Sequence, residues 1–148
     1  MNAPELSSPH LEIAARLRLA VVRTARRLRQ EAGTGLSPSL TAALATIEVG
    51  GPLTPSELAE REAIKRPAAT RIVARLEEEG LVVRAADPSD GRVTLIATTP
   101  AGRELLRRVR RRKNAYLARR MRDLPAEDLV ALERAASVLE RLLEDGRR

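Results

Sequence analysis

Residues 66–92 read RPAATRIVARLEEEGLVVRAADPSDGR, and the hydrophobic periodicity changes partway through this stretch. In its first half, apolar residues recur at helical spacing, which predicts a helix over residues 66–79. Gly80 then ends the helix, with an apolar residue directly after it. The sequence DPSDGR that follows is typical of a tight turn. The stretch therefore predicts a helix followed by a β-hairpin with strands at 81–86 and 92–98. The predicted apolar face of the helix consists of Ala69, Ile72, Val73 and Leu76.

A second, shorter helix is predicted just before this one. Thr54 is a good N-cap, a proline follows it at the first helical position, and Glu57 can complete a capping box. This helix is expected to end near Arg61, and the next four residues form a turn in which Ile64 is buried. The order of short helix, turn, helix and hairpin is that of a winged helix-turn-helix.

Helices are also predicted on both sides of this region. Ser37 followed by Pro38 starts a helix that runs to about Val49. Apolar residues at helical spacing predict helices at the two ends of the chain as well. The predicted fold is mainly α with a small β-hairpin. The terminal helices are expected at residues 11–31, 100–123 and 126–144.

The composition excludes most kinds of catalytic and metal site. The 148 residues include no cysteine and a single histidine, His10, which is expected to precede the first helix. Thiolate metal sites and a Ser-His-Asp triad therefore have no residues to build on. No catalytic group, metal or cofactor is expected, and the chain is predicted not to be an enzyme. Since no apolar stretch is long enough to span a membrane and no signal peptide is recognisable, the protein is expected to be cytoplasmic.

The net charge of +7 is concentrated in one segment. Residues 100–124 contain 10 basic and 2 acidic residues, whereas residues 54–99 contain 7 basic and 8 acidic residues. If the middle of the chain binds nucleic acid, it must do so through individually placed residues rather than through bulk charge.

The predicted exposed face of the helix at 66–79 is suited to the major groove of DNA. Its small residues permit close approach, Arg71 and Arg75 can reach guanine edges or phosphates, and the Thr70 methyl group and Ala74 can meet thymine methyl groups. Arg66 is a poor N-cap, so the free backbone N–H groups there could bind a phosphate, although water would satisfy them equally. Taken alone, such a helix is more often an ordinary amphipathic helix with a solvated face, and it is the short capped helix before it and the hairpin after it that favour DNA binding.

A set of spaced residues resembles the MarR family of bacterial transcription regulators. The matching elements lie between the helix at 66–79 and the start of the next helix. They are Thr70-Arg71, Leu76-Glu77, Gly80-Leu81, Asp87, Asp90-x-Arg92, Thr99 and Gly102.

The resemblance implies a homodimer on double-stranded DNA, acting as a repressor at a roughly palindromic operator and released by a small-molecule effector. Arg92 would be the wing arginine that enters the minor groove, and Asp90 would orient it. Ser89 and Pro67 depart from the common pattern, and the absence of cysteine argues against thiol sensing. The expected DNA-binding residues are Lys65, Arg66, Pro67, Ala68, Thr70, Arg71, Ala74, Arg75, Asp90 and Arg92.

The arginine-rich segment at 103–122 allows three interpretations. Its arginines could form solvated ion pairs with acids of the last helix, such as Glu133 and Glu140. They could steer DNA at long range. Lys113 or Arg120, which fall within the apolar stripe of this helix, could instead lie beside a pocket and attract an anionic ligand.

The last helix has an apolar seam with spacings of three and four residues, which predicts helix packing. With the first helix it is expected to form the dimer interface. The predicted organisation is an N-terminal dimerisation helix at 1–35, a winged helix-turn-helix at 36–99 and C-terminal dimerisation helices at 100–148. The alternative function is a winged-helix module that binds another protein and senses no effector. The seam consists of Leu129, Leu132, Ala136, Leu139 and Leu143.

Overall fold

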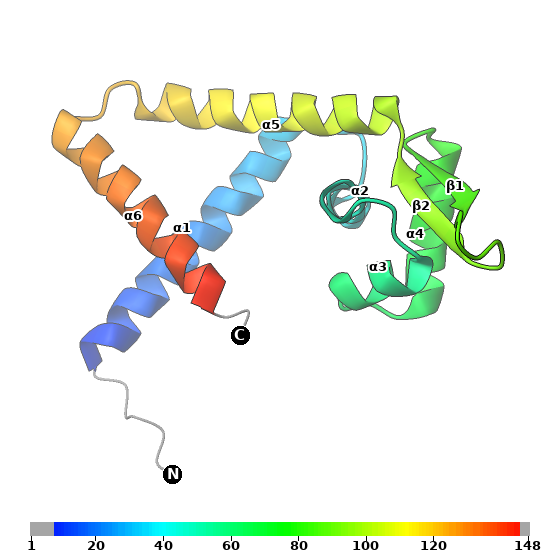
Figure 1. The fold of residues 1–148 in the computed structure, drawn as a ribbon. Coiled ribbons are helices and arrows are strands. Elements are labelled where there is room, and N and C mark those ends of the chain that lie inside the picture. The colour runs from blue at the N-terminus through cyan, green and yellow to red at the C-terminus, as the bar shows by residue number, and fades with distance from the viewer. Residues whose placement is uncertain (1–7, 146–148) are drawn as a thin grey trace, which may run out of the picture. The chain divides into compact units, whose positions relative to one another are not determined.

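The computed structural model describes residues 8–145, which form six helices and a two-stranded antiparallel hairpin (Figure 1). The mainly helical fold with one small hairpin is thus confirmed. Residues up to Lys113 form one compact unit, and residues from Asn114 onwards form a second. The elements are α1 (Ser8–Ala32), α2 (Pro38–Gly50), α3 (Pro55–Arg61), α4 (Arg66–Glu78), β1 (Val82–Ala86), β2 (Thr94–Thr98), α5 (Pro100–Met121) and α6 (Ala126–Asp145).

The predicted helix starts are present in α2 and α3. The Ser37 hydroxyl accepts a hydrogen bond from the backbone N–H of Leu40 at 3.3 Å. Thr54 and Glu57 form the complete capping box, with each side chain accepting from the other residue's N–H group. The bond from the Thr54 backbone holds the pKa of the Glu57 carboxyl below its usual value. Local sequence therefore determines where α2 and α3 begin.

Both α3 and α4 end in the same hydrogen-bonding pattern. After α3, Ala63 N–H donates to Glu60 and Ile64 N–H donates to Ala59. After α4, Gly80 N–H donates to Glu77 and Leu81 N–H donates to Leu76. Each is a Schellman ending, which requires a left-handed residue between the helix and the next segment. The left-handed residues are Ala63 (φ 52°) and Gly80 (φ 70°). Ile64, predicted to be buried, is only half-buried.

The hairpin returns the chain along α4. Its register runs from Val82 opposite Thr98 to Ala86 opposite Thr94. Both strands begin later than predicted. Leu81 is not in β1, because its N–H bonds back to Leu76 at the end of α4, and β2 begins at Thr94, because the N–H groups of Arg92 and Val93 bond to Asp90 within the turn. Leu53 adds a bridge that the sequence did not reveal: it exchanges backbone hydrogen bonds with Ile96 in both directions, at 3.0 and 2.7 Å. A single bridging residue has no periodicity by which it could be recognised.

The apolar core lies where α2, α3, α4, the hairpin and the start of α5 meet. All members of the predicted apolar face of α4 are buried except Ile72, which is half-buried against the core. Gly102 of α5 is packed so closely against the Leu81 carbonyl and the Thr98 side chain that a Cβ atom would collide with both. The largest of the side chains that are under 2% exposed are Leu44, Ile47, Leu58, Leu76, Ile96 and Val73.

The terminal helices are packed very differently. Helix α1 begins at Ser8, earlier than predicted, so His10 lies in its first turn rather than before it. Among the described residues of α1 only Ala32 is buried, and none of α6 is. Each helix has large apolar side chains in contact with solvent. In α1 these are Leu11, Ile13, Leu17, Leu19, Val21 and Val22, and in α6 they are Leu129, Val130, Leu132, Val138, Leu142 and Leu143.

Candidate DNA-binding surface

The outer face of α4 contains the side chains predicted to face DNA. Pro67, Thr70, Arg71 and Arg75 are exposed, while Ala74 is half-buried. The Thr70 hydroxyl donates to the Arg66 carbonyl at 3.0 Å, so its proton is used within the helix. Small or internally bonded side chains on this face leave room for close approach, with the two arginines extending beyond them.

The N-terminus of α4 has no side-chain cap, as the sequence predicted, but the N-cap residue is Lys65 rather than Arg66. Arg66 is the first helical residue and Pro67 the second, a position that needs no intrahelical N–H partner. Lys65 and Arg66 are exposed, and Ala68 beside them is half-buried. The N–H groups of Ala68 and Ala69 donate to the Lys65 carbonyl and Pro67 has none, so what favours an anion here is the positive end of the helix dipole together with two cationic side chains.

The hairpin tip is held together by its own aspartates. The Asp87 carboxylate accepts from the Ser89 hydroxyl and backbone N–H at 2.6 and 2.8 Å, and these bonds hold the pKa of Asp87 below its usual value. The Asp90 carboxylate accepts from both the backbone N–H and the Nε of Arg92, at 3.1 and 3.3 Å. The Asp90–Arg92 pair thus arises from an Asx turn and not from strand pleating. The Arg92 side chain is 93% exposed.

The hairpin tip and the N-terminal end of α4 lie toward the same end of this unit (Figure 1). Because the chain reverses at Gly80, β1 runs back along α4 toward Arg66, and Arg92 follows at the tip. The structure therefore places Lys65, Arg66 and the wing arginine toward one end, with Arg71 along the face between that end and Arg75. The start of α5 lies at the opposite end.

Sequence reasoning missed the role of the three glutamates at 77–79, which it interpreted as a solvated run. Glu78 and Glu79 pair with Arg75, and Glu77 pairs with Arg84 of β1 at 3.0 Å. These contacts depend on side-chain rotamers and, for Arg84, on the hairpin fold. Spacing of three and four residues was the only signal that could have indicated the Arg75 pairs.

The arginine-rich helix uses several of its cations locally. Glu104 accepts from both Arg111 and Arg107, and these contacts, Arg111 first, hold the pKa of the Glu104 carboxyl below its usual value. Arg103 donates to the Thr98 carbonyl at 2.8 Å. Arg112 donates to the Ala32 and Gly33 carbonyls at 2.9 and 3.0 Å, so it caps the C-terminal end of α1. Part of the surplus charge therefore holds α5 to its neighbours.

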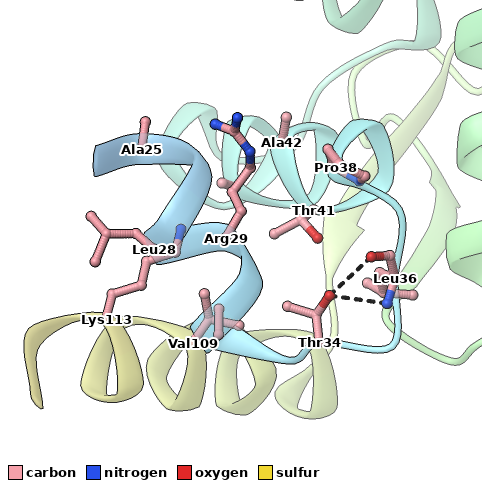
Figure 2. A pocket seen from close by; sticks show the side chains of 12 residues that line it. Ala25, Leu28, Arg29, Thr34, Leu36, Pro38, Thr41, Ala42, Val109 and Lys113 are labelled. Carbon is pink, nitrogen blue, oxygen red and sulfur yellow. Dashed lines mark hydrogen bonds between the residues drawn. The ribbon is translucent and has the colours of Figure 1, made fainter. Parts of the chain in front are cut away.

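A cavity of about 330 Å³ lies between the end of α1, the loop before α2, α2 itself and α5 (Figure 2). Most of its lining is aliphatic, and no aromatic side chain contributes. The Thr34 hydroxyl is hydrogen-bonded to the Leu36 backbone, as the dashed lines in Figure 2 mark. Thr41 supplies a second hydroxyl group, and Arg29 and Lys113 supply the two cations.

Lys113 is half-buried and extends from α5 alongside Leu28 of α1 (Figure 2). It also borders an adjacent cavity of about 200 Å³ that shares Thr41 with the first. Arg120, the other cation predicted within the apolar stripe, is exposed. Of the two candidates, Lys113 is thus the one beside a cavity.

Two further observations concern residues 8–145 alone. In this part of the chain, no three histidine or acidic side chains are close enough together to hold a metal ion. None of the helices formed there has the length and apolar character needed to cross a membrane.

Comparison with known proteins agrees with this geometry. The sequence model of the MarR family matches residues 36–94. An HTH-type transcriptional regulator of Mycobacterium tuberculosis is 36% identical over 134 residues, covering 90% of this chain and 94% of that protein. The HTH-type transcriptional repressor MdtR of Bacillus subtilis is 31% identical over 96 residues, covering 65% of this chain and 62% of MdtR.

The fold of the whole chain is also found in solved structures. A Pseudomonas aeruginosa protein described as a transcriptional regulator superposes with a TM-score of 0.84 at 34% identity, covering 93% of this chain and 98% of that one. The matching family and the relatives of this chain are transcriptional regulators, which are not enzymes, and this confirms the prediction that the chain is not an enzyme. The chain belongs to the MarR family and is a DNA-binding transcriptional regulator with a winged helix-turn-helix.

Proposed function

We propose that this regulator is a homodimeric repressor that binds a roughly palindromic operator and is released by a small anionic effector. In this proposal residues 1–35 and 100–148 supply the dimer contacts, and residues 36–99 contact DNA. The observation that carries the proposal is that the exposed face of α4 and Arg92 at the hairpin tip belong to the same part of the chain, residues 36–99, which we call the DNA-binding lobe. A relative named a repressor, MdtR, supports the direction of regulation.

In this proposal α4 enters the major groove and the wing enters the adjacent minor groove. Arg71 would contact a guanine edge, and Thr70 and Ala74 would contact thymine methyl groups. Lys65 and Arg66 would bind the backbone phosphate at the helix N-terminus, with Pro67 and Ala68 allowing close approach. Asp90 would hold Arg92 for insertion into a narrow minor groove. The near-neutral charge of the lobe makes these few cations decisive.

The dimer is supported by the exposed apolar residues of α1 and α6. A two-fold interface would remove these side chains from water in both protomers at once. A palindromic operator follows from the same symmetry, since each protomer places one α4 in one half-site.

The test is an electrophoretic mobility shift with the DNA upstream of the protein's own gene, at two salt concentrations. We expect affinity to fall steeply with salt, and Arg71→Ala and Arg92→Ala each to weaken binding by ~1–3 kcal/mol. Arg107→Ala is the control, because Arg107 is also an exposed arginine but lies on α5. Wild-type affinity in Arg92→Ala at both salt concentrations would remove the wing from the proposal.

The alternative, a module that binds another protein, predicts no steep salt dependence of DNA binding. The same experiment therefore separates the two functions. A weak shift that is insensitive to salt and to Arg71→Ala would favour the protein-binding module.

Effector release is supported by the cavity beside Lys113. An apolar cavity bordered by two cations suits a small organic anion, and its volume is at the lower end for small-molecule sites. The protons of the Thr34 and Thr41 hydroxyl groups are donated to backbone carbonyls, so the charge of the anion would be met by the cations. The cavity lies between α1, which carries exposed apolar side chains, and α2 of the DNA-binding lobe. A ligand that favours one spacing of these helices over the other would shift DNA affinity.

The probe is a series of aliphatic and aromatic carboxylates of increasing size, tested for raising the thermal midpoint and for releasing DNA. We expect a carboxylate to do both in the wild-type protein and to do neither at the same concentration in Lys113→Gln. The control is Arg120→Gln, which also removes a cation from α5 but at an exposed position that lines neither cavity. Equal responses in wild type and Lys113→Gln would exclude this cavity as the anion site.

A further inference from the structure

The two arginines on the outer face of α4 are in different states. Arg75 Nη2 lies 2.6 Å from Glu79 Oε1, and its Nη1 lies 3.3 Å from Glu78 Oε2. Both terminal nitrogens of this guanidinium therefore point to carboxylates of the same helix. Arg71, one turn earlier, forms no ion pair with any residue between 8 and 145.

The pairs are formed at the edge of the surface that would meet DNA. The side chain of Arg75 is 58% exposed, and those of Glu78 and Glu79 are 68% and 40% exposed. A guanidinium that binds a guanine edge or a phosphate uses the same terminal N–H groups in a bidentate contact. While both pairs are formed, the glutamates fix the orientation of the Arg75 guanidinium and neutralise its charge, so it is less available to DNA than an unpaired arginine.

We propose that Glu79, assisted by Glu78, competes with DNA for the Arg75 guanidinium and thereby limits the affinity of the protein for its operator. This inference rests on the proposed function, in which α4 contacts DNA. Glu79 acts as a positioning residue, since it reaches the DNA only through its hold on Arg75. Arg71 is available at first contact, whereas Arg75 must exchange a carboxylate for a base or phosphate.

The expected size of the effect is modest. Exposed ion pairs are weak, so releasing Arg75 from Glu79 should raise operator affinity roughly two- to fivefold. A simpler mechanism must be separated from this one: removing any carboxylate near DNA reduces its repulsion of phosphates. That repulsion would act whether or not Arg75 is present, and a double-mutant cycle distinguishes the two.

The experiment measures operator affinity for wild type, Glu79→Gln, Arg75→Ala and the double variant. We expect Glu79→Gln to tighten binding in the wild-type background and to change nothing in the Arg75→Ala background. Adding Glu78→Gln should increase the gain further, because Nη1 is then released as well. Glu60→Gln is the control, since Glu60 is an exposed acid on α3 that forms no ion pair within the described part of the chain.

Two results would overturn the inference. An equal gain from Glu79→Gln in both backgrounds would assign the effect to phosphate repulsion. No gain in either background would show that the ion pairs do not compete with DNA. All variants should share the wild-type thermal midpoint to within a degree or so, because the pairs are exposed. If Arg71→Ala, which lies outside this cycle, binds as tightly as wild type, the proposed function fails and the inference fails with it.

Discussion

The DNA-binding lobe and the terminal helices contain similar apolar residues but differ in how far these side chains are buried. In the lobe, Leu58, Leu76 and Ile96 are entirely buried. In the terminal helices, Leu17 and Leu132 remain 38% and 46% exposed. The lobe satisfies its own hydrophobic residues, whereas α1 and α6 retain surface that only another chain or another part of this chain can cover. In the proposed dimer, folding and assembly would therefore depend on separate segments, which can be tested by perturbing each in turn.

The largest effect is expected from a charge on the terminal helices. Leu132→Asp costs little in a lone chain, where this side chain already contacts water. In a two-fold dimer it buries two unpaired carboxylates, and we expect it to weaken association by roughly 5 kcal/mol or more. Sedimentation should change from dimer to monomer while the helical circular dichroism of the lobe persists.

Ser137→Asp is the matched control for that variant. It adds the same charge to α6 away from the apolar seam, so the dimer should survive. A Leu132→Asp protein that sediments like wild type would mean that α6 does not form the interface.

A smaller effect is expected from truncation within the lobe. Leu76→Ala removes a fully buried side chain from the core, and we expect a loss of ~2–5 kcal/mol in the free energy of unfolding. Chemical denaturation measures it. The same truncation at Leu142, which is 60% exposed, should cost far less in the monomeric Leu132→Asp background. Equal losses at the two sites in that background would remove the distinction between the regions.

The next effect concerns the ending of α4. Gly80 has φ 70°, where a side chain is strained, so Gly80→Ala should destabilise the lobe by about 1 kcal/mol. Nothing lies within 4 Å of the position that its Cβ would occupy, so the loss would come from backbone strain alone. Thermal unfolding that is unchanged by this substitution would show that the turn tolerates an alanine there.

The smallest effect is expected at the equivalent position after α3, and its sign is opposite. Ala63 already has a side chain at φ 52°, so Ala63→Gly relieves strain in the folded state. Glycine also makes the unfolded chain more flexible, which offsets part of this gain, so we expect the lobe to be stabilised by only a few tenths of a kcal/mol. The comparison of Ala63→Gly with Gly80→Ala is internally controlled, because both residues follow a helix in the same Schellman ending. Destabilisation by Ala63→Gly would contradict this account.

The sequence predicted what local rules decide and missed what packing decides. Ser37 and Thr54 start helices through their side-chain hydroxyl groups, and Gly80 ends one through its backbone N–H, so α2, α3 and α4 were located to within a residue or two. The hairpin strands were predicted too long, because Leu81 bonds back to the end of α4 and Asp90 bonds to Arg92 and Val93 within the turn. The bridge at Leu53 depends on a strand more than 40 residues away, which no local pattern reveals.

The candidate site divides in the same way. Helical periodicity identified the outer face of α4, since exposure follows from spacing alone. The hold of Glu78 and Glu79 on Arg75 depends on side-chain rotamers, which spacing alone does not decide. The cap that Arg112 places on α1 requires the position of a second segment, and so does the cavity, which the sequence indicated only as one of three interpretations. The position of Lys113 within an apolar stripe was the one local sign that the cavity existed.

Stoichiometry on DNA tests the central claim most directly. A duplex selected by the protein from a random pool would be titrated in full and as a single half-site, with the mass of each complex measured. We predict two chains on the full duplex, bound through two related half-sites, and much weaker binding to the half-site. One chain on the full duplex, with equal affinity for the half-site, would contradict a lobe that reads DNA and terminal helices that pair it.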